Sequence, residues 1–167
     1  EMVKCFSKNP EESCGLVQLK HDYQAKKLYG DNYGYRSGLN QSMVDHLSDI
    51  VIKIENRINL KDGDLIIDIA SNDGVLLAKY KNTKLDLIGI DPTSEKFKEY
   101  YPSYIEHVND FFSEKIVKEA RPNKKAKVIT SIAMFYDLPH PLLMMQEIEK
   151  VMDHEGIWVV EQSYMPE

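Results

Sequence analysis

Two short segments of the sequence place carboxylates and small residues where a ligand with a ribose could bind. The first runs from Asp68 to Gly74 as Asp-Ile-Ala-Ser-Asn-Asp-Gly and begins within an apolar run. The second ends at Asp91, 23 positions beyond Asp68, and also follows apolar residues. Small residues let the backbone turn tightly around a ligand, and a carboxylate at the end of a second strand can accept hydrogen bonds from both ribose hydroxyls. The pair predicts a site for a ligand that carries an adenosine-type ribose.

The residues of the first loop favour S-adenosylmethionine over a dinucleotide. A dinucleotide-binding loop has the pattern Gly-x-Gly-x-x-Gly, whereas this loop has one glycine, Gly74, and a small residue, Ala70, at an earlier position. Asp68 and Asp73 would repel a pyrophosphate but would suit a cationic sulfonium or an amino group. Two other interpretations stay open: Asp73 as the N-cap of a following helix, and Asp91 before a proline as a turn former.

Predicted strands and helices alternate from residue 38 onward. Strands are predicted at 65–70, 85–91, 104–108, 126–131 and 157–161, the first two as runs so apolar that both faces must be buried. Helices are predicted at 38–59, 75–81, 94–100, 113–120 and 140–152. The longest helix has Ser37 and Asn40 as candidate N-caps. This alternation predicts an α/β, doubly wound fold with a mostly parallel sheet and helices on both faces.

Length and composition exclude several classes of protein. The chain has 167 residues, which fits one domain, and its net charge of −6 argues against a general nucleic-acid binder. Its apolar runs are shorter than the roughly 20 residues of a membrane span. Its two cysteines, Cys5 and Cys14, are too few for a disulfide framework, so we expect a cytoplasmic protein. Because it starts at Glu1 and stops after an apolar run, we expect a piece of a longer chain.

The segment 68–74 resembles motif I of class I S-adenosylmethionine-dependent methyltransferases in the form Asp-x-x-Ser-Asn-Asp-Gly. With Tyr-Arg-Ser-Gly at 35–38, Gly-Ile-Asp-Pro at 89–92 and Val-Val-Glu-Gln-Ser-Tyr at 159–164, it is similar to the sugar C-methyltransferase family over about residues 14–166. The resemblance implies carbon methylation of a nucleotide-linked keto-deoxysugar, and a Rossmann-like sheet of strand order 3-2-1-4-5. That family has two further strands after the fifth, which this chain lacks.

The resemblance also implies two parts. Residues 1–27 would be the remnant of an N-terminal zinc-binding module, with the segment 14–19 matching its end, and residues 28–167 would be a cofactor-binding core truncated after its fifth strand. Zinc sites usually need four closely spaced ligands, and the first expected cysteine pair is missing. His21 and Asp22 could contribute ligands, but we expect no metal in this chain and zinc only in the intact protein.

Roles in cofactor binding follow from the resemblance by position. Ser71, Asn72 and Gly74 would line the methionine end, and Asp91 would hold the ribose. Asp110 would lie near the adenine, with a helix cap as its alternative role. The predicted cofactor-binding residues are Asp68, Ala70, Ser71, Asn72, Asp73, Gly74, Asp91, Pro92, Asp110, Phe111, Ser131 and Ala133.

Carbon methylation beside a keto group needs a base for the α-proton and a group that holds the enolate oxygen. By the resemblance, Tyr35 and Tyr33 match an early catalytic tyrosine, and Tyr136 stands where the family can have a histidine, with His140 the nearest histidine. Tyr35 as a packed aromatic and His140 as an exposed helix residue remain open. A downstream Tyr-x-Glu-His cluster is absent from this chain. We therefore expect binding of S-adenosylmethionine, with S-adenosylhomocysteine as product, at a catalytically incomplete site.

Other functions are distinguished by their ligands and partners. An NAD-linked oxidoreductase domain is disfavoured by the acidic loop with its single glycine, and a non-catalytic Rossmann-like binding module would bind partners through its sheet edge. The expected partner is a small-molecule acceptor, a nucleotide sugar, and neither nucleic acid nor a membrane. An exposed edge at 157–161 would also favour self-association.

Overall fold

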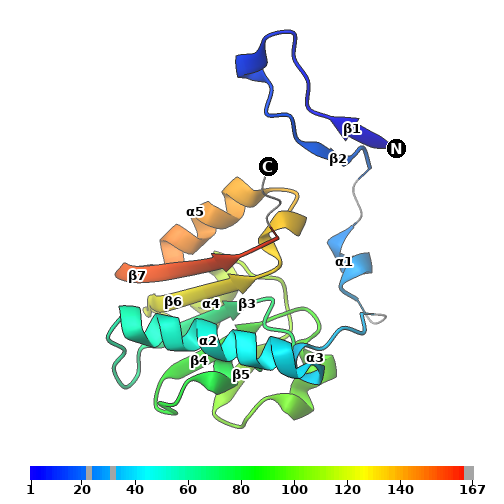
Figure 1. Cartoon of the computed structure of the whole chain (residues 1–167). Helices are drawn as coiled ribbons and strands as arrows, with labels where there is room; N and C mark the ends of the chain where they lie inside the picture. Colours follow the sequence, from blue (N-terminus) through cyan, green and yellow to red (C-terminus); the bar gives the residue numbers. More distant parts are fainter. Residues whose placement is uncertain (22–23, 31–32, 164–167) are drawn as a thin grey trace.

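Five apolar segments form one parallel sheet in the order β5-β4-β3-β6-β7 (Figure 1). The computed structural model describes residues 1–21, 24–30 and 33–163. The strands are β3 (Leu65–Ile69), β4 (Asp86–Ile90), β5 (Ile105–Val108), β6 (Ala126–Ile132) and β7 (Met152–Glu161). Counted along the chain, the order is 3-2-1-4-5, which confirms the predicted sheet. Successive strands are added on one side of β3 up to β5 and on its other side from β6 onward. The order of the strands therefore reverses between β3 and β6, which is the place where open α/β sheets bind their ligands.

The strand register brings the carboxyl ends of the three central strands level with one another. Ile69 at the end of β3 pairs with Ile90 of β4 on one side and with Ser131 of β6 on the other. The loops that follow these strands therefore leave the sheet side by side. This alignment places residues 70–74, 91–93 and 133–138 around one space.

Helices cover both faces of the sheet, as predicted (Figure 1). On one face, α2 (Gln41–Arg57) buries Leu47, Val51 and Ile54 in a cluster that includes Ile66 of β3. The other face carries α4 (Glu114–Ala120) and α5 (Pro141–Val151), whose buried residues include Val117. The short α3 (Ser94–Phe97) and the 3-10 turns η2 (Ser37–Leu39), η4 (Lys98–Tyr100) and η5 (Phe135–Asp137) complete the connections. Asn40 caps α2, because its side chain accepts a hydrogen bond from the backbone of Ser42.

The prediction of a helix over 75–81 was wrong. The structure has only one 3-10 turn there, η3 (Leu77–Lys79). Leu76, Leu77 and Tyr80 of this segment are all buried, so contact with the sheet fixes its backbone. The loop 70–74 after β3 therefore does not lead into an α-helix.

The N-terminal region forms a small unit that stands apart from the sheet (Figure 1). It contains an antiparallel pair, β1 (Met2–Lys4) and β2 (Val17–Leu19), with the 3-10 turn η1 (Pro10–Glu12) between them. The sequence analysis predicted neither β1 nor the single-turn helix α1 (Ala25–Leu28). Both are short and lack a repeating apolar pattern.

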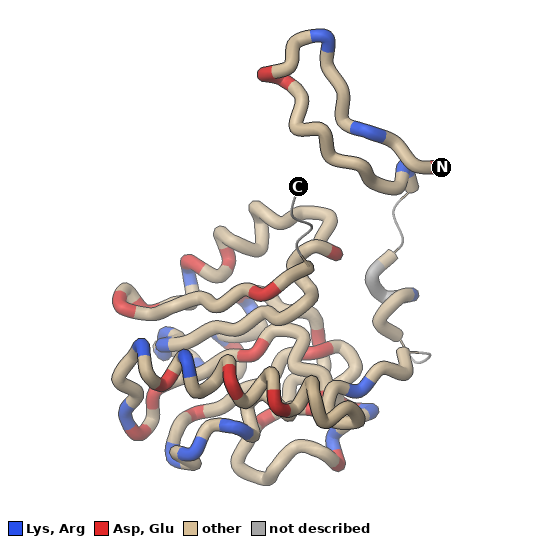
Figure 2. Tube along the Cα trace, in the orientation of Figure 1, with Lys and Arg blue, Asp and Glu red and all other residues tan. Residues whose placement is uncertain are grey.

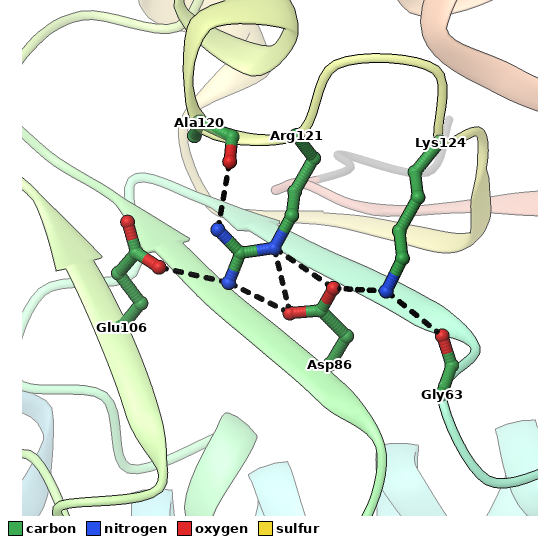
Figure 3. A network of polar contacts seen from close by, with 6 residues as sticks. All are labelled: Gly63, Asp86, Glu106, Ala120, Arg121 and Lys124. Carbon is green, nitrogen blue, oxygen red and sulfur yellow. Dashed lines mark hydrogen bonds and ion pairs between the residues drawn. The ribbon is translucent and has the colours of Figure 1, made fainter.

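An ion-pair network at the opposite edge of the sheet joins the start of β4 to the end of α4 (Figure 3). The Asp86 carboxylate accepts from Arg121 Nε at 2.8 Å and from Lys124 Nζ at 2.6 Å, and Arg121 also bonds Glu106 of β5 at 2.8 Å. Burial opposes ionisation of Asp86, but these hydrogen bonds keep its pKa below the usual range. Every charged group of this network is paired, so we assign it a structural role.

Charges of both signs are distributed around the rest of the core (Figure 2). Among the described residues, none of the helices combines the length and apolar character needed to cross a bilayer.

Candidate functional site

A cavity of about 580 Å³ lies at the carboxyl ends of the strands. Its walls come from the loops after β3, β4 and β6, the end of β7 and parts of α2 and α5. Tyr29, Tyr33, Tyr35 and Ser37 complete them. The volume lies within the range of about 300–1,000 Å³ that is typical of small-molecule sites. The cavity is therefore large enough for a cofactor-sized ligand.

The Asp91 carboxylate joins the loop after β3 to the turn after β4. One oxygen accepts from the Asn72 backbone N–H at 2.9 Å, and the other accepts from the backbone and hydroxyl of Thr93, each at 2.6 Å. Asp91 is 6% exposed and borders the cavity. The role of Asp91 as a turn former is thus present in the structure. Since a carboxylate oxygen has two lone pairs, the oxygen bonded to Asn72 can still accept from a ligand.

The loop between the two carboxylates has a left-handed backbone at alternate residues. Ala70, Asn72 and Gly74 have φ of 58°, 54° and 72°. Such angles are costly for Ala and Asn, so the surrounding contacts must hold them. The loop turns its backbone toward the cavity through this conformation.

The buried Tyr101 hydroxyl forms hydrogen bonds to the same loop. It donates to the Asn72 carbonyl oxygen at 3.0 Å and lies 2.7 Å from the Ser71 hydroxyl, which then donates to it. Burial raises the Tyr101 pKa, so the phenol remains a donor at neutral pH. A Cβ atom at Gly89 would lie 2.5 Å from the Ser71 Oγ, which explains the glycine within β4.

The side chains of Asn72 and Asp73 bind the upstream segment 35–38. Asn72 donates from Nδ2 to the Tyr35 carbonyl oxygen at 3.0 Å and accepts from the Ser37 N–H at 2.9 Å. Asp73 accepts from the Gly38 N–H at 2.9 Å. The predicted alternative of Asp73 as a helix N-cap is not observed, because no helix follows. These two side chains hold the tyrosine-containing segment at the cavity.

Arg36 also fixes the segment 35–38. Its Nε lies 3.7 Å from the Asp73 carboxylate, and its guanidinium lies 3.8 Å from the centre of the Tyr100 ring. The second Asp73 oxygen is buried and has no hydrogen-bond partner among the described residues.

All four predicted catalytic residues, Tyr33, Tyr35, Tyr136 and His140, line the cavity. Burial raises the pKa of both Tyr33 and Tyr136, and nearby carboxylates such as Asp91 and Asp137 add to the effect. Protonated phenols donate hydrogen bonds and are poor bases. These two tyrosines are therefore better suited to bind an oxyanion than to remove a proton.

Asp68, near the carboxyl end of β3, is 4% exposed and also lines the cavity. Burial raises its pKa to about 7, although a hydrogen bond from Thr130 at 2.5 Å opposes the shift. A carboxyl group with such a pKa at a cavity wall indicates a functional position.

Four predicted cofactor-binding residues lie outside the cavity lining, namely Asp73, Gly74, Asp110 and Ser131. Asp110 is exposed, and its side chain accepts from the Phe111 N–H at 2.7 Å. Its alternative as the cap of α4 is not observed, because Ser113 caps that helix. Ser131 is fully buried and its hydroxyl accepts from the Trp158 indole at 3.0 Å. The remaining predicted residues, Asp68, Ala70, Ser71, Asn72, Asp91, Pro92, Phe111 and Ala133, all line the cavity.

Two polar pairs at the cavity were not found from the sequence. Tyr29 donates to Asp137 at 2.6 Å, and His46 Nε2 lies 2.9 and 2.7 Å from the two oxygens of Glu161. The partners of each pair are more than 100 positions apart, so only the fold reveals them.

The charged groups of the lining are acidic. Five carboxylates border the cavity, and no Lys or Arg is among its described lining residues. They are Asp68, Asp91, Asp137, Glu147 and Glu161. A cavity of this charge favours a cationic ligand over an anionic one.

The N-terminal cysteines do not form part of a metal cluster in the described parts of the chain. No group of three or more His, Cys, Asp or Glu residues within 1–21, 24–30 and 33–163 is arranged to hold a metal ion. Asp22, named above as a possible zinc ligand, and Tyr164 of the motif at 159–164 lie outside the described residues.

Comparison with known proteins points to methyltransferases. No family model matches the chain. The chain is 24% identical over 155 residues to the C-methyltransferase NovU of Streptomyces niveus. The aligned region covers 92% of this chain and 37% of NovU. It thus spans little more than a third of the curated relative's length.

Two solved structures share the fold. The plantazolicin methyltransferase BpumL in complex with a triazolic desmethylPZN analog and SAH (S-adenosylhomocysteine) matches with a TM-score of 0.55 and 15% identity, over 70% of this chain and 45% of that one. The carbon methyltransferase of CurJ matches with a TM-score of 0.54 and 14% identity, over 85% and 39%. The chain has the Rossmann-like fold of class I S-adenosylmethionine-dependent methyltransferases.

The contact between Gly38 and Asp73 gives a first prediction. A Cβ atom at Gly38 would lie 2.7 Å from Asp73 Oδ2, whereas one at Gly34 meets no atom within 4 Å. We expect Gly38→Ala to loosen the segment 35–38 and to increase the rate of tryptic cleavage after Arg36 by about tenfold, the equivalent of about 1.4 kcal/mol of local opening. Gly34→Ala is the matched control and should be cleaved at the wild-type rate. Equal rates in all three proteins would contradict this account of the segment.

The raised pKa of Asp68 gives a second prediction. Between about pH 4, where the unfolded carboxyl ionises, and about pH 7, where the folded one does, the folded state binds more protons. Its ionisation therefore lowers the free energy of unfolding as the pH rises through this window. Asp68→Asn should remove this loss and gain on the order of 2–4 kcal/mol over the wild type between pH 4 and pH 8. Urea denaturation of both proteins measures the difference, and a difference that is independent of pH would refute the assignment.

Proposed function

We propose that the chain forms the cofactor-binding part of an S-adenosylmethionine-dependent methyltransferase. The observation that carries this proposal is the Asp91 carboxylate, which ends β4, borders the cavity and keeps a free lone pair beside the loop 70–74. The names of the relatives, NovU as a C-methyltransferase and BpumL in complex with SAH, support it.

The residues present fit this cofactor. The free lone pair of Asp91 suits a ribose hydroxyl, and Phe111 supplies an apolar surface for the adenine. Asp68 and the acidic lining suit the ammonium and the sulfonium, and Ala70 and Ala133 leave room near them. When bound, the cofactor supplies an electrophilic methyl group.

For the acceptor we propose a carbon atom beside the keto group of a nucleotide-linked deoxysugar. Motif resemblance and the name of NovU support this class. The protonated phenols of Tyr33 and Tyr136 suit the oxygen of an enolate, as does that of Tyr35 by its position. The cavity favours a neutral sugar ring, since its described lining offers no cation for the diphosphate. The diphosphate would then lie outside the cavity.

We also propose the two-part organisation, with residues 1–27 as the end of a zinc-binding type of module and the core from residue 28. The separate β1–β2 unit supports the division (Figure 1). Cys5 and Cys14 are free thiols, which suits a reducing cytoplasm.

Titration calorimetry with S-adenosylhomocysteine and with NAD tests the cofactor. We expect binding of S-adenosylhomocysteine in the micromolar range and none of NAD. Asp91→Ala should lower the affinity at least tenfold, because it removes the ribose acceptor. The control Thr93→Val removes one support of the same carboxylate but leaves the acceptor, and should change affinity less than threefold. Binding of NAD, or of neither ligand, would contradict the proposal.

Self-association is proposed for the outer edge of β7. Among the described residues β7 pairs only with β6, and Val160 on it is 39% exposed. A sheet edge with free backbone groups favours pairing with another chain. We expect sedimentation velocity to show dimers as the concentration rises, and Val160→Lys to reduce them. A monomer throughout the concentration range would exclude this association.

A further inference from the structure

Carbon methylation needs a base, and the tyrosines of the cavity are poor candidates for it. Burial raises the pKa of Tyr29, Tyr33 and Tyr136, so these phenols stay protonated near neutral pH. A protonated phenol can hold an enolate oxygen but cannot accept the α-proton. If the proposed function is right, on which this inference rests, the base must be a carboxylate or an imidazole.

Most carboxylates of the cavity already serve other contacts. Asp68 is buried in the sheet and bonded to Thr130. Asp91 accepts three hydrogen bonds that hold the ligand loop. Asp137 accepts the Tyr29 hydroxyl at 2.6 Å, so one of its oxygens is already hydrogen-bonded.

Glu161 differs from these groups because its partner is an imidazole. It is the last residue of β7 and lines the cavity, while His46 of α2 stands beside it with Nε2 at 2.7 and 2.9 Å from its two oxygens. Both side chains are roughly 40–45% exposed, so water can reach the pair. A proton taken up by the carboxylate could therefore pass to the imidazole or to solvent.

The backbone of Glu161 places this pair next to the turn after β6. Its carbonyl oxygen accepts from the Ala133 N–H at 2.7 Å, and Ala133 has a left-handed φ of 53°. Ala133 lines the cavity between β6 and the loop that carries Tyr136. Glu161 and the loop that carries Tyr136 thus follow adjacent strand ends, and both residues line the cavity.

We propose that Glu161 is the general base of the methyl transfer and that His46 is its positioning residue. The C–H bond next to the keto group breaks, the proton moves to a Glu161 oxygen, and its electron pair becomes that of the enolate. The enolate carbon then forms a bond to the methyl carbon as the methyl–sulfur bond breaks, and the sulfur keeps that electron pair. A carboxylate is sufficient as base when the enolate oxygen accepts hydrogen bonds.

Exchange of the acceptor's α-proton with solvent deuterium measures this step without methyl transfer. The probe is a thymidine-diphosphate-linked 4-keto-6-deoxyhexose, incubated in D2O with the protein and S-adenosylhomocysteine and followed by mass spectrometry. Wild-type protein should exchange the proton. Glu161→Gln should slow the exchange at least about 100-fold, the lower range for loss of a general base. Glu149→Gln on α5, an exposed residue that does not line the cavity, is the matched control and should exchange at the wild-type rate.

Variants of His46 separate positioning from folding. His46→Gln keeps a donor for Glu161 and should retain most of the exchange, whereas His46→Leu should lose about tenfold. The affinity for S-adenosylhomocysteine should stay unchanged in all of these variants.

The outcomes distinguish this inference from the proposed function. Wild-type exchange that persists in Glu161→Gln overturns the assignment of the base, as does a parallel loss of S-adenosylhomocysteine binding, which would mean a structural role. No exchange by the wild type would instead overturn the proposed acceptor class, and the base assignment with it.

Discussion

The Asp91 carboxylate is the contact on which the arrangement of the site depends. It accepts hydrogen bonds from Asn72 on the loop after β3 and from Thr93 on the turn after β4. Neither loop is part of a helix, and the first has three left-handed residues. Without a buried acceptor between them, the backbone N–H of Asn72 would lack a partner, which is costly in a protein interior. One carboxylate thus accepts hydrogen bonds from the backbone N–H groups of both loops and still presents a lone pair to the cavity.

Further contacts extend outward from the same loop. The Asn72 carbonyl is bonded by Tyr101, and the Asn72 side chain holds the backbone of residues 35–37. A ligand bound against Asp91 would therefore contact a loop that is already coupled to the tyrosine-containing segment. Through this coupling, a ligand at Asp91 would also affect the position of Tyr35.

Carboxyl groups at the two ends of the strands have different partners. At the amino edge, Asp86 is paired with Arg121 and Lys124, and its pKa is lowered despite burial (Figure 3). At the carboxyl ends of the strands, Asp68 has no basic partner among the described residues, and burial raises its pKa. Burial of a carboxyl group that has no basic partner reduces stability, so the position of Asp68 at the cavity is better explained by ligand binding than by folding.

Much of the fold could be predicted because its signals are local. Strands buried on both faces appear as apolar runs, and α2 shows a helical period with Asn40 before it. The segment 75–81 misled the analysis because its apolar residues meet the sheet through a single 3-10 turn. The cavity lining at Asp68, Asp91 and the tyrosines followed from their positions after strands or in the upstream motif.

Other features of the site depend on tertiary contacts that no local pattern contains. The sequence shows Asn72 and Asp73 as loop residues but does not show that their side chains face residues 35–38. The pair of His46 and Glu161 forms only because the fold brings α2 and the end of β7 together. Burial, which raises the pKa of Tyr33 and Tyr136, likewise depends on the whole fold.

A crystal structure of the protein with S-adenosylhomocysteine would test the central claim most directly. We predict that a ribose hydroxyl lies within hydrogen-bond distance of the Asp91 carboxylate while the Asn72 N–H remains bonded to it. A ligand bound away from Asp91, or a carboxylate that releases Asn72 in order to bind the ribose, would contradict the account.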